Sequence, residues 1–239
     1  MRKWLLAAFV CGSLFAGTLG SASGAPNELR TPDAVINWAI PNLNNYWRQE
    51  FGASNLRYRS PVYVHWYNRP GLGWARVPRG CDDWGPRDGY KWMGYSSKYL
   101  PNSFYCSANE RLYLDYQLFR SLLRYDDGRA AVVIAHEWSH HVQHLLGWPE
   151  RRRLRQKQFA HFELHADCYA GTFFAWAQDE GELDSNDLAH AERALGNFGD
   201  PDKTPWYEPN AHGGTSLREE WFLHGFDTAS PRECDRVFG

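Results

Sequence analysis

The segment Val133–His140 has residue types and spacing that can hold a metal ion and activate water. His136 and His140 are four residues apart, so on a helix both rings lie on one face, and Glu137 lies beside them. Two imidazoles at this spacing are typical zinc ligands, and the carboxylate between them can act as a general base toward water. Apolar residues of the same helix fall on another face, so the pattern predicts a metal site and not two core histidines. His144 is more than one turn beyond His140, too far to join the same ion.

A second segment offers the third ligand. Glu163 and Asp167 are four residues apart and lie within the apolar stripe of residues 159–174, where an unpaired ionised carboxylate is costly. A zinc ion for Glu163 and the N–H of a ligand imidazole for Asp167 would provide the missing partners, and pairing of each acid with an arginine is the alternative. His161 and His165 are also four residues apart, but they project away from Glu163 and are left out of the predicted site.

These side chains need helices to position them, and the hydrophobic pattern predicts a chain that is mainly helical after a short region of strands. Helices are expected near 32–50, in short pieces interrupted by Pro41, and at 127–146, 151–180, 185–196 and 216–224, with strands at 60–67 and 111–116 and loops at 69–104 and 197–215. Ser216 and Glu219 have the spacing of a capping box at the start of the last helix.

The composition is that of a globular protein. The chain has 239 residues, of which 43% are hydrophobic and 16% aromatic, enough for one large domain with a core. Lys and Arg total 26 against 28 Asp and Glu, so no basic footprint for nucleic acid is present. The 12 tryptophans either fill a core or line a groove.

Residues 1–25 have the layout of a secretory signal peptide. Two basic residues precede the apolar stretch Trp4–Leu19, and small residues follow. We expect export with cleavage near Ala22 or Ala25 and no membrane span in the mature chain, because the stretch is shorter than the roughly 20 residues of a spanning helix. A membrane-anchored form, including a lipid link at Cys11, is the less favoured alternative.

Four cysteines remain in the mature chain, namely Cys81, Cys106, Cys168 and Cys234. An even number in an exported protein predicts two disulfides, and the absence of a C-x-x-C pair argues against a zinc knuckle or a redox site. Spacing alone does not choose among the three possible pairings.

Several separated blocks resemble the bacterial neutral zinc metallopeptidases that carry H-E-x-x-H followed by E-x-x-x-D. The blocks are Phe104–Cys106, Leu112–Asp115, Val133–Gln143, Glu163–Gly171, His212–Ser216 with Arg218, and Trp221–Phe222 followed by Gly225–Asp227. The chain departs from the family pattern at Ser139, where Gly or Ala is usual, and at Asn109, where Asp is usual.

The resemblance implies a role for each residue of the site. It makes His136, His140 and Glu163 the ligands of one catalytic Zn²⁺, Glu137 the general base, and Asp167 the hydrogen-bond partner of a ligand histidine.

The resemblance also implies the fold and the disulfides. It suggests an α+β, zincin-like domain over residues 26–239, with a small mixed or antiparallel sheet and an active-site helix in a lobe that ends near 147, and a helical lobe at 148–239. It pairs Cys81 with Cys106 and Cys168 with Cys234.

The predicted function is that of a secreted zinc metallopeptidase acting on peptides or proteins. His212, in a glycine-rich loop, is the first candidate to stabilise the oxyanion, and the strand at 111–116 is expected to pair with an extended substrate. Two alternatives share the metal site: a zinc hydrolase of a non-peptide amide in cell-wall material, and a glycan-binding module with a structural metal. A structural zinc needs four protein ligands, and no fourth ligand is evident at helical spacing.

Overall fold

The computed structural model describes residues 29–67, 69–70, 103–148, 159–205 and 211–238. The elements are α1 (Pro32–Ala53), β1 (Tyr63–Tyr67), β2 (Phe104–Cys106), β3 (Arg111–Asp115), α2 (Tyr116–Leu122), α3 (Gly128–Leu145), α5 (Phe159–Asp179), α6 (Ser185–Asn197), α7 (Thr215–Thr228) and α8 (Pro231–Phe238). The fold is therefore α+β and mainly helical, as predicted. Within these residues no helix combines the length and apolar character that crossing a membrane requires.

The sheet has three strands in the order β1-β3-β2. β3 runs parallel to β1 and antiparallel to β2, so the sheet is mixed. Tyr63–Tyr67 pairs with the whole of β3 on one side, and Phe104–Cys106 pairs with Arg111–Tyr113 on the other. Because β3 is the central strand, the expectation that residues 111–116 pair with an extended substrate is wrong. The sequence pattern placed Phe104 in a loop and did not predict β2.

Helix α1 runs unbroken through Pro41, where the sequence predicted short helices. Thr31 accepts the backbone N–H of Ala34 at 3.1 Å, so the predicted start is confirmed. Pro41 is exposed, and buried side chains lie on both sides of it along the helix. An internal proline costs about 3 kcal/mol. Burying one large apolar side chain stabilises the fold by about 1.5–3 kcal/mol. The burial of Leu43 and Trp47 together therefore exceeds the cost of the proline.

The start of α7 differs from the predicted capping box. Gly214 is the cap residue of α7 and makes no side-chain bond there, while Ser216 lies inside the helix. The backbone N–H and the hydroxyl of Ser216 both donate to Asp202, at 2.9 Å each. A carboxylate from the preceding loop therefore satisfies the helix terminus in place of a residue of the helix itself.

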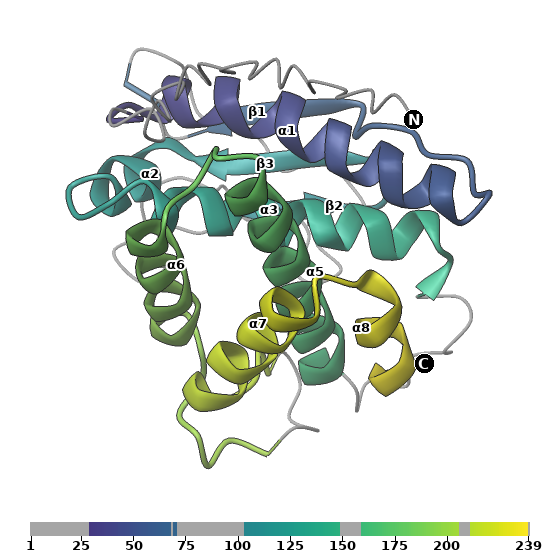
Figure 1. The fold of residues 1–239 in the computed structure, drawn as a ribbon. Coiled ribbons are helices and arrows are strands. Elements are labelled where there is room, and N and C mark those ends of the chain that lie inside the picture. Colours follow the sequence, from purple (N-terminus) through teal and green to yellow (C-terminus); the bar gives the residue numbers. More distant parts are fainter. Residues whose placement is uncertain (1–28, 68, 71–102, 149–158, 206–210, 239) are drawn as a thin grey trace, which may run out of the picture.

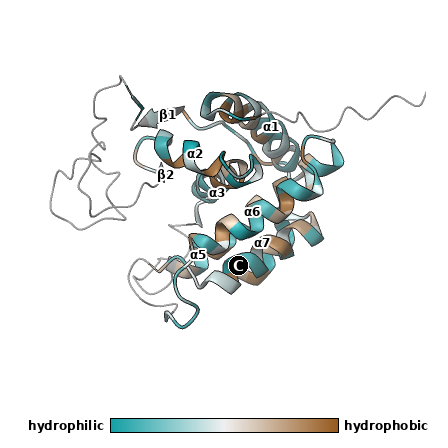
Figure 2. Ribbon diagram, turned by 90° about the vertical axis from the view of Figure 1, so that its left-hand side faces the viewer, coloured by the Kyte–Doolittle hydropathy of each residue, from teal (hydrophilic) through white to brown (hydrophobic). Residues whose placement is uncertain are grey.

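One hydrophobic core joins the described elements. Figure 1 shows α1 and the strands at one end of the molecule and α6, α7 and α8 at the other. The buried residues of this core lie in α1, β2, β3, α2, α3, α5, α6, α7 and α8. They include Trp47, Leu114, Ile134, Phe173, Leu195 and Phe222. Figure 2 shows that α1 and α6 each carry a hydrophilic and a hydrophobic side, as is typical of helices packed around such a core.

Helices α5 and α7 cross with their backbones in contact. A Cβ atom at Gly171 of α5 would lie 2.0 Å from the Phe222 carbonyl oxygen, and one at Gly225 of α7 would lie 1.9 Å from the Cys168 carbonyl oxygen. Neither contact leaves room for a side chain. This close approach brings the first turn of α7, with Arg218, against the middle of α5.

Candidate metal site

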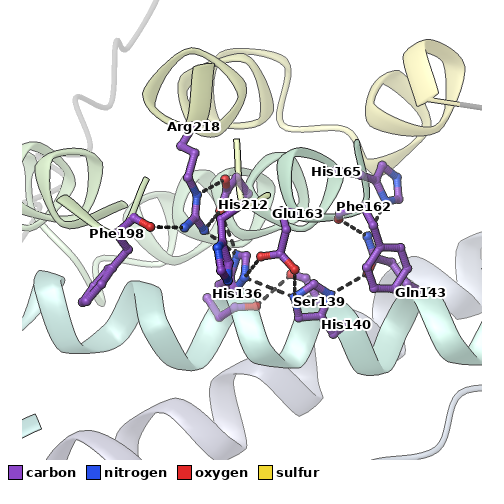
Figure 3. A network of polar contacts seen from close by, with 12 residues as sticks. His136, Ser139, His140, Gln143, Phe162, Glu163, His165, Phe198, His212 and Arg218 are labelled. Atoms are coloured by element: carbon purple, nitrogen blue, oxygen red, sulfur yellow. Dashed lines mark hydrogen bonds and ion pairs between the residues drawn. The ribbon is translucent and has the colours of Figure 1, made fainter. Parts of the chain in front are cut away.

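Three potential ligands from α3 and α5 converge on one point. His136 and His140 project from α3 and Glu163 from α5, and all three are largely buried (Figure 3). His136 Nε2 lies 3.1 Å from His140 Nε2 and 3.2 Å from Glu163 Oε2, and His140 Nε2 lies 3.4 Å from Glu163 Oε1. The structure thus brings together the two histidines and the glutamate that the sequence proposed as ligands.

These separations fit a zinc ion. With Zn–N and Zn–O bonds of about 2.0–2.2 Å and tetrahedral angles, two ligand atoms lie about 3.3–3.5 Å apart. The three measured separations, 3.1, 3.2 and 3.4 Å, are close to that value. Two imidazoles and one carboxylate are also a donor set typical of catalytic zinc, which keeps a fourth position for water.

Asp167 and Arg218 fix the ring of His136. Asp167 Oδ1 lies 2.8 Å from His136 Nδ1, so the Nδ1–H donates to the carboxylate and Nε2 keeps its lone pair for a cation. Arg218 donates to both oxygens of Asp167, at 2.8 Å each, and to the carbonyl oxygen of Phe198 at 3.3 Å. The expected hydrogen bond between Asp167 and an imidazole of the predicted site is therefore present, and an arginine pairs with the same acid. The sequence offered the imidazole and the arginine as alternative partners of Asp167, and the structure contains both.

Gln143 fixes the ring of His140. Its side-chain oxygen lies 2.8 Å from His140 Nδ1, and its amide nitrogen donates to the carbonyl oxygen of Phe162 at 2.8 Å (Figure 3). Because the amide group must face that carbonyl, the oxygen faces His140 and accepts its Nδ1–H. Sequence reasoning missed this role of Gln143, although its position three residues after His140 on one helix was available as a signal.

Glu137 is buried beside the cluster. Burial raises the pKa of Glu137, while His136 and His140 lower it in part, and a backbone hydrogen bond from Tyr105 of β2 holds the carboxylate. A carboxylate with a raised pKa accepts a proton more readily, which suits a general base. The Tyr105 hydroxyl in turn contacts His144 Nδ1 at 2.8 Å and His141 Nδ1 at 3.1 Å, so β2 is tied to α3.

The electrostatics of the cluster favour a cation. Burial alone raises the pKa of Glu163, but His140 and His136 hold it well below its usual value. Burial alone lowers the pKa of His136, but Asp167 and Glu163 raise it to about 10. The carboxylates that attract this proton would attract a divalent cation in its place, so a metal ion competes with a proton for His136.

The histidines excluded by the sequence lie outside the cluster. His165 is fully buried and stacks on Trp148 with ring centroids 3.9 Å apart. His161 contacts Phe238 of α8, with ring centroids 6.1 Å apart. His144 is held by the hydroxyl of Tyr105. None of the three is part of the ligand group formed by the described residues.

His212 lies in the loop before α7. Its backbone N–H donates to Asp200 at 2.6 Å, and its side chain is half exposed. The next residue, Gly213, has φ +92°, and a Cβ there would lie 2.8 Å from Leu164, the neighbour of Glu163. The loop therefore packs against α5 beside Glu163, and Figure 3 draws His212 with the residues of the cluster.

Of the two departures from the family pattern, Ser139 is fully hydrogen-bonded and Asn109 only in part. Ser139 is fully buried and donates its hydroxyl to the carbonyl oxygen of Ala135 at 2.7 Å, so it adds no unpaired polar atom beside the ligands. Asn109 donates to the hydroxyl of Tyr113 at 3.0 Å, and its side-chain oxygen is buried without a hydrogen-bond partner among the described residues.

A second group of acids, Asp126, Asp127 and Asp187, lies where α3 and α6 begin. Asp126 accepts the backbone N–H of Gly128 at 2.9 Å, and Asp187 accepts that of Asp184 at 2.8 Å, so two of these acids serve helix starts. Burial and the neighbouring Asp127 raise the pKa of Asp187 to about 8.

The C-terminal disulfide agrees with the predicted pairing. Cys168 of α5 is bonded to Cys234 of α8. Cys106 is also in a disulfide, and Cys81 lies outside the described residues, so the bond between these two stays a prediction. The cysteines of the second helix and the tail are joined as expected.

Comparison with known proteins places the chain in a family. The family model described as "Putative neutral zinc metallopeptidase" matches residues 94–237, a span that includes the whole cluster. "Uncharacterized protein YpfJ" of Escherichia coli strain K12 is 31% identical over 219 residues, which are 84% of this chain and 69% of that protein. "Uncharacterized protein Rv2575" of Mycobacterium tuberculosis strain H37Rv is 30% identical over 157 residues, 55% of this chain and 54% of that protein. No solved structure matches. With more than half of its length matched by the family model, and with His136, His140 and Glu163 gathered at one point, the chain belongs to the neutral zinc metallopeptidase family.

Proposed function

We propose that this chain is a secreted zinc metallopeptidase that hydrolyses peptide bonds. The observation that carries the proposal is the convergence of His136 Nε2, His140 Nε2 and Glu163, 3.1–3.4 Å apart, beside a buried glutamate. Three protein ligands leave a position open for water and substrate, as catalytic zinc requires. The described ligand group has these three members, which favours catalysis over a purely structural metal.

Each residue has a role in the proposed reaction. A zinc ion held by His136, His140 and Glu163 would lower the pKa of a water molecule and polarise the scissile carbonyl. Glu137 accepts the proton of the attacking water and passes it to the leaving amine, for which its raised pKa is suited. His212 stabilises the oxyanion from its loop.

We also propose that the protein is exported and that its mature part forms a single domain. We place a signal peptide at residues 1–25 and a single zincin-like domain at 26–239. The Cys168–Cys234 disulfide supports an oxidising compartment. The single core that runs from α1 to α8 supports one domain.

The test is a metal analysis of the purified mature protein combined with a casein-type assay, with and without chelator. We expect one zinc per chain and hydrolysis that stops in chelator and returns with zinc. The Glu137→Gln protein is the matched control, because it keeps the ligands and removes the base. Zinc without hydrolysis of any protein, but with cleavage of cell-wall amides, would replace the peptide substrate by a non-peptide one. Zinc without any hydrolysis would refute the proposed enzymatic function.

A further inference from the structure

The ring of His140 stands at one end of a hydrogen-bonded chain that leaves the metal site. Gln143 links it to His165, because the Gln143 amide nitrogen lies 2.9 Å from His165 Nδ1 (Figure 3). The other ring nitrogen of His165, Nε2, lies 3.2 Å from Asp235 Oδ1 on α8. The chain thus runs from a ligand on α3, across α5, to the C-terminal helix.

The direction of every bond in this chain is determined. Asp235 is an acceptor, so His165 donates from Nε2 and presents a lone pair at Nδ1. The lone pair of His165 and the carbonyl oxygen of Phe162 both accept the amide group of Gln143, so the Gln143 oxygen faces His140. His140 must then carry its hydrogen at Nδ1, which leaves the Nε2 lone pair pointing at Glu163 and His136.

The far end of the chain is held in place independently. Cys234, next to Asp235, is bonded to Cys168 of α5. Tyr169 of α5 also donates its hydroxyl to Asp235. The ring of His165 is stacked on Trp148, so it cannot turn freely away from Asp235.

We propose that Asp235 is a positioning residue for the metal site: through His165 and Gln143, and together with the carbonyl oxygen of Phe162, it holds the tautomer and orientation of His140. The proposal rests on the proposed function only in that a metal binds His140. Loss of the acceptor at position 235 lets His165 place its hydrogen on Nδ1, against the Gln143 amide group. The tautomer of His140 that can bind metal has its hydrogen on Nδ1, and this tautomer is then less strongly favoured.

The experiment measures Zn²⁺ affinity by competition with a chromogenic chelator, together with the visible spectrum of the Co²⁺-loaded protein. We expect Asp235→Ala to weaken Zn²⁺ binding about tenfold, the lower end of the 10–100-fold effects of residues that orient ligands. The Co²⁺ spectrum should shift, because the geometry at His140 changes. Asp235→Asn keeps an acceptor oxygen and should restore both readouts. Glu233→Ala, on the same helix and paired with Arg236 at the surface, is the control that should change neither.

A double-mutant cycle with Gln143→Leu separates this route from a general effect of α8. If Asp235 acts through Gln143, Asp235→Ala causes no further loss of affinity in the Gln143→Leu protein. Equal losses in both backgrounds, or a loss in Asp235→Asn as large as in Asp235→Ala, would overturn the proposal. A wild-type protein that binds no zinc would refute the proposed function as well, whereas a zinc-binding wild type with unchanged Asp235→Ala refutes this inference alone.

Discussion

Replacing Arg218 by methionine tests how the buried charges of the site are balanced. Arg218 is 3% exposed and donates to both oxygens of Asp167, which is fully buried. Methionine fills similar space but offers no donor, so Asp167 keeps only His136 as a charged partner. Removing one member of a buried ion pair typically costs about 3–5 kcal/mol. We expect the lower end, about 3 kcal/mol, because the bond to His136 remains.

The loss should depend on pH in a defined direction. Burial alone raises the pKa of Asp167, but Arg218 and His136 hold it below its usual value, so the ionised carboxylate stabilises the wild type at neutral pH. This contribution is present above the unfolded-state pKa of about 3.9 and is lost as the pH falls through the lower folded-state pKa. Without Arg218 the pKa of Asp167 rises, and the carboxyl can take up a proton. The difference between the two proteins is therefore largest near neutral pH and shrinks in acid.

The assay is thermal or urea unfolding in the presence of chelator, so that metal binding does not contribute. A loss of 3 kcal/mol corresponds to a decrease of about 6–12 °C in Tm for a chain of this size. Arg236→Met is the matched control, because Arg236 lies on the surface and its pairing with Glu233 contributes little. A loss below about 1 kcal/mol, or one that is as large in acid as at neutral pH, would refute the reasoning.

Three further substitutions test the site, and peptide mapping tests the second disulfide. Glu137→Gln should retain zinc, measured by metal analysis, while hydrolysis falls by about 10²–10⁴-fold, since the carboxylate is a base; loss of the metal would make Glu137 a ligand. Glu163→Ala should lower zinc affinity severely, with Asp167→Asn losing about 10–100-fold, in the same competition assay; normal zinc binding in the first variant would place the third ligand elsewhere. Non-reducing peptide mapping should recover Cys81 joined to Cys106, and recovery of either as a free thiol would contradict the pairing.

The ligand set could be proposed from sequence because helical periodicity fixes which side chains share a face. His136 and His140 follow from one helix, and Glu163 with Asp167 from another. Periodicity does not say which helices meet, so it cannot predict contacts that cross from one helix to the next. Arg218 lies 51 residues from Asp167, and Asp235 lies 70 residues from His165. Only packing brings those pairs together.

The errors in the fold have a similar cause. β2, α2 and α8 are three to eight residues long, too short for a periodic pattern to stand out. Pro41 is a local signal that opposes a helix, and the burial of side chains on both sides of it is a tertiary effect that the local signal does not contain. The position of β3 between two strands likewise depends on β2, which the sequence did not reveal.

The glycine contacts between α5 and α7 limit how the site can open. Because carbonyl oxygens sit where side chains would otherwise separate the two helices, any hinge between them would expose backbone and pull Arg218 from Asp167. These helices must therefore move as one rigid body. In the proposed reaction, a substrate would therefore have to reach the ligand cluster without separating these two helices.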